Sequence, residues 1–282
     1  MGVVQQQPFP PERVNRGAAG GEDGRGGGTV LDMATGPHTL AIDVGGTGLK
    51  ATVLDATGTP EHERVRTPTT YPCPPTQLVD QLAELVAPLP PFDRVSVGFP
   101  GVVRGGVVRT APTFETTGGL GSDSDPDLVA AWRGFDLAGA LATRLGAPCR
   151  AANDADVQGA GASSGSGLEL IITLGTGLGS TVFRDGKLAL HLELAHHPIR
   201  GEDTYNSYLG DAARKSIGKA KWNRRVARAV DILDVLIVPD AILIGGGNAK
   251  HVQADRGPKV RLIDNAEGLL GGIRLWDGDG LE

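Results

Sequence analysis

The chain has 282 residues and a formal net charge of −6, and 40% of its residues are hydrophobic, which excludes wholesale disorder and predicts one or two domains. Two cysteines far apart in the sequence, Cys73 and Cys149, exclude a disulfide scaffold and favour a reducing compartment. The sequence has no apolar run long enough to span a membrane and no signal-peptide pattern, and its mild acidity argues against bulk nucleic-acid binding, so we expect a cytoplasmic protein.

Residues 1–37 differ in composition from the rest of the chain. They contain nine glycines and show no hydrophobic periodicity, so they cannot bury enough apolar surface to offset the entropy lost on ordering. We predict a disordered tail in this segment.

From His38 onward the pattern predicts alternating strands and helices. In chain order these are a hairpin (39–44 with 49–54), a helix (77–87), a strand (94–99), a helix (127–145), two strands (168–174 and 180–183), one or two helices within 211–237, a strand (241–244) and a closing helix (265–276). Pro126 at its start and Gly146 at its end support the second helix. This alternation indicates an α/β architecture.

Glycine is the most informative residue type, because 43 of the 282 residues are glycine, roughly twice the usual share. Three clusters each follow an apolar strand, at 45–48, 175–179 and 245–247. A strand that ends in glycines exposes backbone N–H groups and has no Cβ to keep an anion away. Tight turns also need glycine, so a single cluster would be weak support. Neither the P-loop pattern nor the dinucleotide-binding spacing is present. Three clusters together favour phosphate binding.

Several short segments together resemble the motifs of the actin-like sugar kinases. Residues 43–50 resemble their first phosphate motif, residues 174–179 their second phosphate motif, and residues 244–247 their adenosine motif. Asn153-Asp154 is similar to the family's Asn-Asp pair, and Glu193-Leu194-Ala195-His196 resembles the sugar motif of the ROK group (repressors, open reading frames, kinases).

The order and spacing of these motifs match over about residues 38–277, and residues 98–103 are most similar to polyphosphate glucokinases within the ROK group. The resemblance implies an α/β fold of the actin-like ATPase (ribonuclease H-like) type with two lobes. It implies an N-terminal lobe at 38–152, a C-terminal lobe at 153–264, and a closing helix and tail at 265–282 that packs back on the N-terminal lobe. Because family members usually form dimers, it also implies a homodimer.

The resemblance assigns Asp154 as the general base that accepts the proton of a sugar 6-hydroxyl; a helix N-cap is the alternative interpretation. It assigns Asp43 as a Mg²⁺ ligand acting through water, and an ordinary turn residue is the alternative. For Lys50, a phosphate contact and a surface lysine are equally good interpretations. The residues expected to bind the donor phosphates or nucleotide are Gly45, Gly46, Thr47, Lys50, Gly175, Thr176, Gly177, Gly245, Gly246 and Gly247.

The residues expected to bind the sugar are Asn153, Thr113, Glu193 and His196. Glu193 and His196 stand at positions i and i+3, which places them on one face of a turn or helix. The neighbouring histidines raise a metal cluster as an alternative, but the cysteine-rich zinc motif of many ROK proteins is absent.

The chain departs from the family pattern at two places. Ala195 stands where the family has glycine before the motif histidine, and Thr113 stands where polyphosphate glucokinases have a sugar-binding asparagine. An insertion rich in Gly, Ser and Asp follows at 116–125. Because hydrogen-bonding pockets discriminate strongly between sugars, these departures leave open which hexose is bound.

A basic run has two interpretations. Seven basic residues and no acidic residue lie within 214–228, which is typical either of a solvated helix face or of a groove for an extended polyanion. The function we predict is phosphoryl transfer from polyphosphate, ATP or both to the 6-hydroxyl of glucose, with Mg²⁺ required. An ATP-dependent kinase of another hexose or N-acetylhexosamine is the alternative, and a non-catalytic sugar-sensing protein is the alternative from another class.

Overall fold

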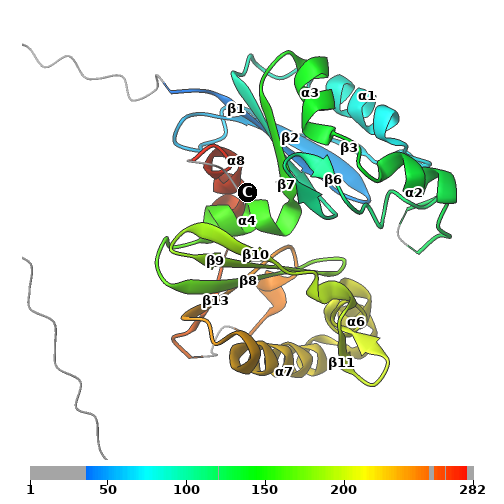
Figure 1. Cartoon of the computed structure of the whole chain (residues 1–282). Helices are drawn as coiled ribbons and strands as arrows, with labels where there is room; N and C mark the ends of the chain where they lie inside the picture. Colours follow the sequence, from blue (N-terminus) through cyan, green and yellow to red (C-terminus); the bar gives the residue numbers. More distant parts are fainter. Residues whose placement is uncertain (1–35, 120, 254–256, 264, 278–282) are drawn as a thin grey trace, which may run out of the picture. The chain divides into compact units, whose positions relative to one another are not determined.

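The computed structural model describes residues 36–119, 121–253, 257–263 and 265–277. Residues 1–35 of the predicted tail therefore lie outside the described residues. The described residues form one compact unit. Within it, two five-stranded sheets and their helices confirm the predicted α/β class (Figure 1).

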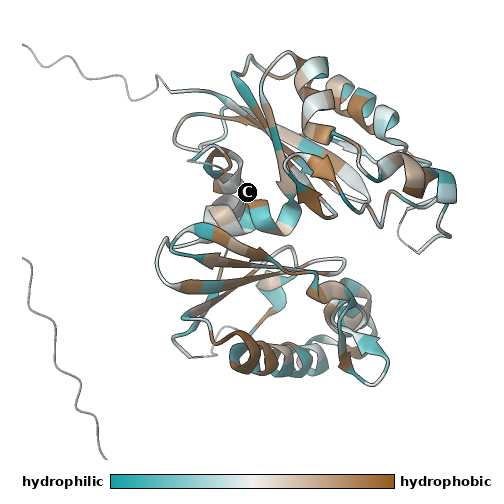
Figure 2. Cartoon of the chain, in the orientation of Figure 1, coloured by the Kyte–Doolittle hydropathy of each residue, from teal (hydrophilic) through white to brown (hydrophobic). Residues whose placement is uncertain are grey.

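The first sheet has the strand order β3-β2-β1-β4-β7. Its strands are β1 (Thr39–Val44), β2 (Gly48–Leu54), β3 (Val65–Pro68), β4 (Arg94–Phe99) and β7 (Cys149–Asn153). β1, β4 and β7 are parallel, whereas β2 pairs antiparallel with both β1 and β3. Alternate apolar residues of these strands are buried on one face against α1 (Pro75–Val86) and α3 (Leu137–Leu145), as the two-residue period of a strand requires (Figure 2).

The second sheet has the order β10-β9-β8-β13-β14. Its strands are β8 (Leu168–Leu174), β9 (Leu178–Arg184), β10 (Lys187–His191), β13 (Ala241–Gly245) and β14 (Val260–Leu262). One face packs against α5 (Tyr205–Leu209) and α7 (Lys219–Ile237) around the buried Trp222. The three consecutive apolar residues at 170–172 of β8 are all buried, so both faces of this strand are covered and its sequence does not alternate there.

Helix α4 (Asp154–Ala162) contacts strands of both sheets, and α8 (Asn265–Arg274) packs against α4 and against β1. Glycine makes this helix crossing possible, because a Cβ at Gly271 would lie 1.7 Å from the Val157 carbonyl oxygen. The start of α4 is therefore held at a defined place beside the ends of β1 and β4.

The remaining described elements are short. They are β5 (Val103–Arg104), β6 (Val107–Val108), α2 (Pro126–Trp132), β11 (Pro198–Arg200), β12 (Asp203–Thr204), α6 (Asp211–Ile217) and the 3₁₀ helices at Leu194–His196 and Ala249–His251. None of the helices in the described part of the chain is long and apolar enough to cross a membrane.

One predicted helix is wrong as a single element. The segment 127–145 forms two helices, α2 and α3, separated at Gly134, whose φ of +81° is unfavourable for a helix. Asp136 then begins α3, because its carboxylate accepts a hydrogen bond from the Gly139 N–H (2.8 Å). Apolar spacing alone did not reveal this cap. The one or two helices predicted within 211–237 are α6 and α7, divided at Gly218.

Candidate functional site

The first glycine cluster forms the turn between β1 and β2. The Gly45 N–H donates to the Gly48 carbonyl (3.1 Å), which closes the turn. Two side chains from the segment after β3 hold it from outside: Thr69 Oγ1 donates to the Gly45 carbonyl (2.7 Å) and the Tyr71 hydroxyl to the Gly46 carbonyl (2.8 Å). Sequence reasoning missed both supports, because they lie more than twenty residues away along the chain.

The second and third clusters are joined to each other. Asn248, which follows Gly247, donates from its side-chain amide to the Gly175 carbonyl (2.9 Å), and its N–H donates to the Leu174 carbonyl (2.8 Å). The side chain of Asn206 accepts from the Leu178 N–H (2.9 Å) and so fixes the second loop on its other side. Neither asparagine was among the predicted site residues.

The glycines of these loops are required for different structural reasons. Gly246 has a φ of +84°, and a Cβ there would lie 2.5 Å from the Leu174 carbonyl oxygen, so the turn itself requires glycine. A Cβ at Gly177 would meet Asn206 at 2.0 Å. A Cβ at Gly175 or Gly247 would meet nothing within 4 Å. The open space at these two positions is a cradle that a side chain would fill, as expected where a ligand approaches the backbone.

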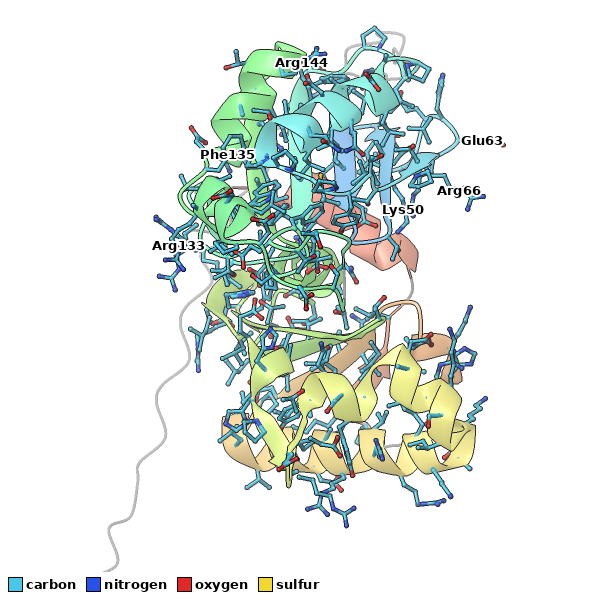
Figure 3. All side chains as sticks on the ribbon, turned by 90° about the vertical axis from the view of Figure 1, so that its right-hand side faces the viewer. Lys50, Glu63, Arg66, Arg133, Phe135 and Arg144 are labelled. Carbon is cyan, nitrogen blue, oxygen red and sulfur yellow. The ribbon has the colours of Figure 1, made fainter. Side chains whose placement is uncertain are left out.

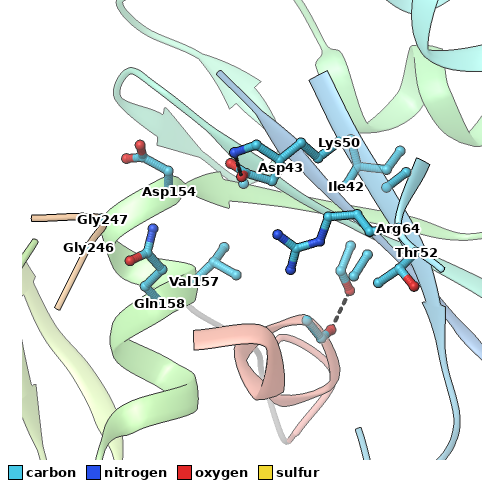
Figure 4. A pocket seen from close by; sticks show the side chains of 15 residues that line it. Ile42, Asp43, Lys50, Thr52, Arg64, Asp154, Val157, Gln158, Gly246 and Gly247 are labelled. Atoms are coloured by element: carbon cyan, nitrogen blue, oxygen red, sulfur yellow. Dashed lines mark hydrogen bonds and ion pairs between the residues drawn. The ribbon is translucent and has the colours of Figure 1, made fainter. Parts of the chain in front are cut away.

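A cavity of about 270 Å³ lies beside these loops (Figure 4). It brings together Asp43 from the end of β1, Lys50 from β2, Asp154 from the start of α4, and Gly246 and Gly247 from the third loop. Its remaining lining comes from Ala41, Ile42, Ala51, Thr52, Arg64, Ser96, Gly98, Val157, Gln158 and Gly272. Residues from the first and third predicted motifs therefore share one cavity with the predicted base.

Asp154 occupies the first position of α4, where a carboxylate is favoured by the helix dipole. It is partly accessible to solvent but lies deep in the protein, and burial is the largest cause that raises its pKa from 3.8 to about 7. The charge of Asp43 raises this pKa further, a hydrogen bond from the Ala155 N–H lowers it, and the charges of Asp156 and Glu193 raise it again. A carboxylate with a pKa near neutrality is suited to accept a proton.

Asp43 and Lys50 form an ion pair, because Lys50 Nζ donates to Asp43 Oδ2 at 2.9 Å (Figure 4). Both side chains remain close to half exposed, 43% for Lys50 and 48% for Asp43. Lys50 is thus neither an isolated surface lysine nor a free cation, since its charge is already shared with the carboxylate beside the cavity.

Asn153 is the residue before α4 and caps it, since its side-chain oxygen accepts from the Ala155 N–H (2.8 Å). The side-chain amide donates to the Gly101 carbonyl at 3.0 Å. The N-cap alternative considered for Asp154 therefore describes Asn153 instead. One amide hydrogen and one lone pair of Asn153 remain for a ligand.

A chain of three charged side chains runs from the buried Asp156 through His191 to the exposed Glu193. His191 Nδ1 lies 2.9 Å from Asp156 Oδ2, and His191 Nε2 lies 2.9 Å from Glu193 Oε1. Burial lowers the pKa of His191, but the hydrogen bonds to both carboxylates outweigh it and raise this pKa to about 10. His191 is therefore a cation that orients Glu193. Sequence reasoning considered His191 only as a metal ligand and missed this role.

The other two predicted sugar residues, Thr113 and His196, are not among the residues that line the cavity. Thr113 packs against the first glycine loop, since a Cβ at Gly46 would lie 2.6 Å from Thr113 Cγ2. His196 ends the 3₁₀ turn that Glu193 precedes, and its side chain is exposed. Thr47 and Thr176 are also exposed at the tips of the first and second loops.

The residues of the cavity fit a hydrated magnesium ion better than a metal held by the protein alone. The described side chains contain no group of three or more His, Cys, Asp or Glu that could hold a metal ion. Mg²⁺ usually binds through one or two carboxylates together with substrate phosphates and water. Asp43 meets this requirement, because Oδ1 has no partner among the described residues and Asp154 adds negative charge nearby.

Comparisons with known proteins agree with one another. The model of the ROK family matches residues 39–197. The chain is similar to polyphosphate glucokinases of Mycobacterium tuberculosis (30% identity over 249 residues, covering 83% of this chain and 89% of that protein) and Mycobacterium leprae (28% over 251 residues, covering 82% and 72%). Among solved structures it is similar to the inorganic polyphosphate/ATP-glucomannokinase of Arthrobacter sp. strain KM (TM-score 0.70, 28% identity, 84% of this chain and 97% of that one). The ROK family glucokinase of Streptomyces griseus, crystallised with glucose and AMPPNP, has a similar fold (TM-score 0.65, 19% identity, 84% and 98%).

Proposed function

The chain belongs to the ROK family, and from this premise we propose that it transfers the terminal phosphoryl group of polyphosphate or ATP to the 6-hydroxyl of glucose. The two sheets and their helices form the actin-like ATPase fold of ROK sugar kinases. Membership of the ROK family confirms the prediction made from the motifs.

The observation that carries the proposal is the placement of Asp154. Its carboxylate lies in one cavity with Asp43 and with two glycines of the third loop, and its pKa is raised to about 7. At neutral pH about half of such a group is ionised, so it is a base whose strength suits the working pH. A positioned base of this kind contributes a factor of roughly 10² to 10⁴ to the rate.

In the proposed reaction Asp154 accepts the proton of the sugar 6-hydroxyl as the oxygen attacks the terminal phosphorus. The phosphorus–oxygen bond to the rest of the donor breaks, and the shortened donor leaves with the bonding electrons. The open space at Gly175 and Gly247 lets the donor phosphates approach the backbone of both loops. The Gly175 N–H is engaged by the Gly177 carbonyl (2.9 Å), so the Gly247 N–H is the one that would donate to a phosphate oxygen. Catalysis of this type rests on positioning and on compensation of phosphate charge rather than on covalent chemistry.

Asp43 is the residue that would hold Mg²⁺ through water, with the donor phosphates completing its shell. When bound, the ion would reduce the negative charge on the transferring group. Thr47 and Thr176, at the exposed loop tips, would donate their hydroxyls to phosphate oxygens.

On the sugar side we assign Glu193, Asn153, Thr113 and His196 to the hydroxyl groups. Glu193 is held by a cationic His191 through Oε1. Its Oε2 has no partner among the described residues and would accept from a sugar hydroxyl. Asn153 is fixed by two hydrogen bonds and keeps one N–H for the sugar. Fixed partners discriminate strongly between sugars, because the wrong sugar leaves them unpaired.

One assay tests the proposal. Glucose, mannose, fructose and N-acetylglucosamine are each incubated with ATP or with polyphosphate, and the sugar phosphate is measured. We expect glucose 6-phosphate with at least one donor and the highest kcat/KM for glucose. Glucose binding without transfer from either donor would overturn the kinase proposal and support a sugar-sensing protein.

Two further assignments concern the molecule in the cell. We propose that it acts in the cytoplasm, in keeping with two free thiols, Cys73 and Cys149, and that it is a homodimer, as the family resemblance implies. Light scattering coupled to size-exclusion chromatography measures the mass, and a monomer at micromolar concentration would contradict the dimer.

A further inference from the structure

A row of residues crosses the first sheet from the candidate base to its open edge. A Cβ at Gly98 on β4 would lie 3.5 Å from the Asp154 Cα, and Gly98 is in register with Asp43 on β1. Asp43 is in register with Lys50 on β2, and Lys50 with Arg66 on β3. β3 is the edge strand, so the row ends where the sheet meets solvent.

These side chains occupy the face that lines the cavity. The apolar neighbours Leu49 and Ala51 are buried in the core on the opposite face, so Lys50 points away from the core. Arg66 is exposed and follows the partly buried Val65, which packs against the same core. In Figure 3, Lys50 and Arg66 lie near each other beside the first sheet.

The row contains two cationic side chains, Lys50 and Arg66, and one anionic side chain, Asp43. Like charges directly opposite each other on neighbouring strands are destabilising, yet Lys50 and Arg66 stand opposite each other. Asp43 compensates Lys50 alone. Arg66 has no ion pair or side-chain hydrogen bond within the described part of the chain.

Arg64 adds a second uncompensated cation. It lies two residues before Arg66 and has no side-chain partner among the described residues. It lines the cavity that holds Asp43 and Asp154, which is called the donor cavity below. Figure 4 shows its guanidinium pointing into the cavity, near the Lys50–Asp43 pair. The neighbouring acid, Glu63, forms no ion pair with a described residue. An unpaired guanidinium beside phosphate-binding loops is suited to phosphate oxygens.

We propose that Arg64 and Arg66, together with Lys50, form a track that binds the distal phosphates of polyphosphate. The proposal rests on the function given above. A nucleotide held at its adenosine by residues 245–247 has no phosphates left to reach the sheet edge. A linear polyanion has no such anchor, so its chain can follow the cations from the cavity to Arg66. Arg64 would then contact either donor, and Arg66 the polymer alone.

The basic run at 214–228 is a weaker candidate for this track. Arg214 and Lys215 both pair with Asp211, and Arg225 lies over the Tyr208 ring at 4.4 Å and donates to its carbonyl oxygen (3.2 Å). The remaining four residues of the run are exposed and do not line the donor cavity: Lys219, Lys221, Arg224 and Arg228. They fit the solvated helix face considered above.

The experiment compares the variants Arg64→Ala and Arg66→Ala with two controls. Arg133→Ala removes another exposed arginine without a described partner, on the opposite side of the molecule in Figure 3. The double variant Lys221→Ala/Arg224→Ala tests the rival surface. Each protein is titrated with medium-chain polyphosphate at several salt concentrations without sugar, and KM and kcat are measured with polyphosphate and with ATP.

We expect Arg66→Ala to raise the Kd for polyphosphate about three- to fivefold and to leave the KM for ATP within a factor of about two. The slope of log Kd against log salt should fall by about one, because one fewer counterion is displaced. Arg64→Ala should weaken both donors. Arg66→Ala should not lower the Tm, since it removes the repulsion with Lys50.

If Arg66→Ala binds polyphosphate as tightly as the wild type, the proposed track is wrong. The track is also wrong if only the Lys221→Ala/Arg224→Ala protein loses affinity for polyphosphate. Either result would leave the kinase proposal intact. A wild-type protein that transfers phosphate from neither donor would overturn the proposed function. The titrations without sugar would still decide whether the track binds polyphosphate. Absence of any polyphosphate binding to the wild type would overturn the track.

Discussion

The position of Asp154 makes its ionised form unfavourable for the stability of the folded protein. Its pKa of about 7 lies above its ordinary value of 3.8, chiefly through burial and then through the charge of Asp43. Between these two pH values the folded state binds more protons than the unfolded chain, so this group makes the protein less stable as the pH rises from 4 to 7. We propose that this cost in stability is retained because ionised Asp154 is the form that would accept the proton of the sugar hydroxyl.

Replacing this carboxylate should therefore lower the activity and, above neutral pH, raise the stability. We expect Asp154→Asn to lower kcat by a factor of roughly 10² to 10⁴, because the base is lost while the shape is kept. The same variant should have a higher Tm than the wild type at pH 8 and a smaller difference near pH 4.5. Thermal denaturation across this pH range measures the difference, with Asp127→Asn at an exposed helix start as the control. Parallel Tm curves for Asp154→Asn and wild type would contradict the raised pKa.

At the scale of secondary-structure elements, glycine serves two different purposes. In the crossing of α4 and α8, Gly271 lies so near the Val157 carbonyl that any Cβ would force the helices apart. In the second loop, Gly175 faces open space and its φ does not require glycine. Packing between elements explains the first glycine, and we propose that the approach of the phosphoryl donor explains the second.

Two matched substitutions test this distinction. Gly271→Ala should destabilise the fold by about 1–3 kcal/mol, because the added methyl group overpacks a helix contact. Gly175→Ala should leave the free energy of unfolding within about 1 kcal/mol of wild type and should raise the KM for the phosphoryl donor. Chemical denaturation and steady-state kinetics provide the two measurements. Unchanged donor KM in a folded Gly175→Ala protein would remove the second loop from the donor site.

At the scale of the whole molecule, the candidate site is assembled from distant parts of one compact unit. The loops after β1, β8 and β13 and the start of α4 come together although the chain between the first and last of them spans about two hundred residues. Ligands that bind across such an assembly stabilise the folded state by mass action.

We therefore expect glucose and donor each to raise the Tm of the wild type. At a concentration one hundred times its Kd, a ligand adds about 2.7 kcal/mol, which corresponds to a rise of roughly 5–10 °C for a protein of this size. Asp154→Asn should keep the shift with glucose, since binding does not need the base. A scanning fluorimetry series provides the test, and the absence of a shift with glucose at millimolar concentration would count against the sugar site.

Local sequence determined the strands, the positions of the glycine loops and the family. The largely apolar segments at 39–44, 168–174 and 241–244 form β1, β8 and β13. A short apolar segment bounded by turn residues is sufficient to predict a buried strand, because the pattern of side chains along the strand follows from which of its faces are buried. The motif order was sufficient to identify the ROK family, since each motif lies in a short contiguous segment.

Tertiary contacts determined which charges face each other. Strand register and side chains remote in sequence determine the pairing of Lys50 with Asp43 and the chain Asp156–His191–Glu193. They also leave Arg66 without an ion pair among the described residues. The same holds for the division of 127–145 into two helices, which a cap decides rather than apolar spacing. Electrostatic energies depend on distance and burial, and neither is encoded in a local pattern of residues.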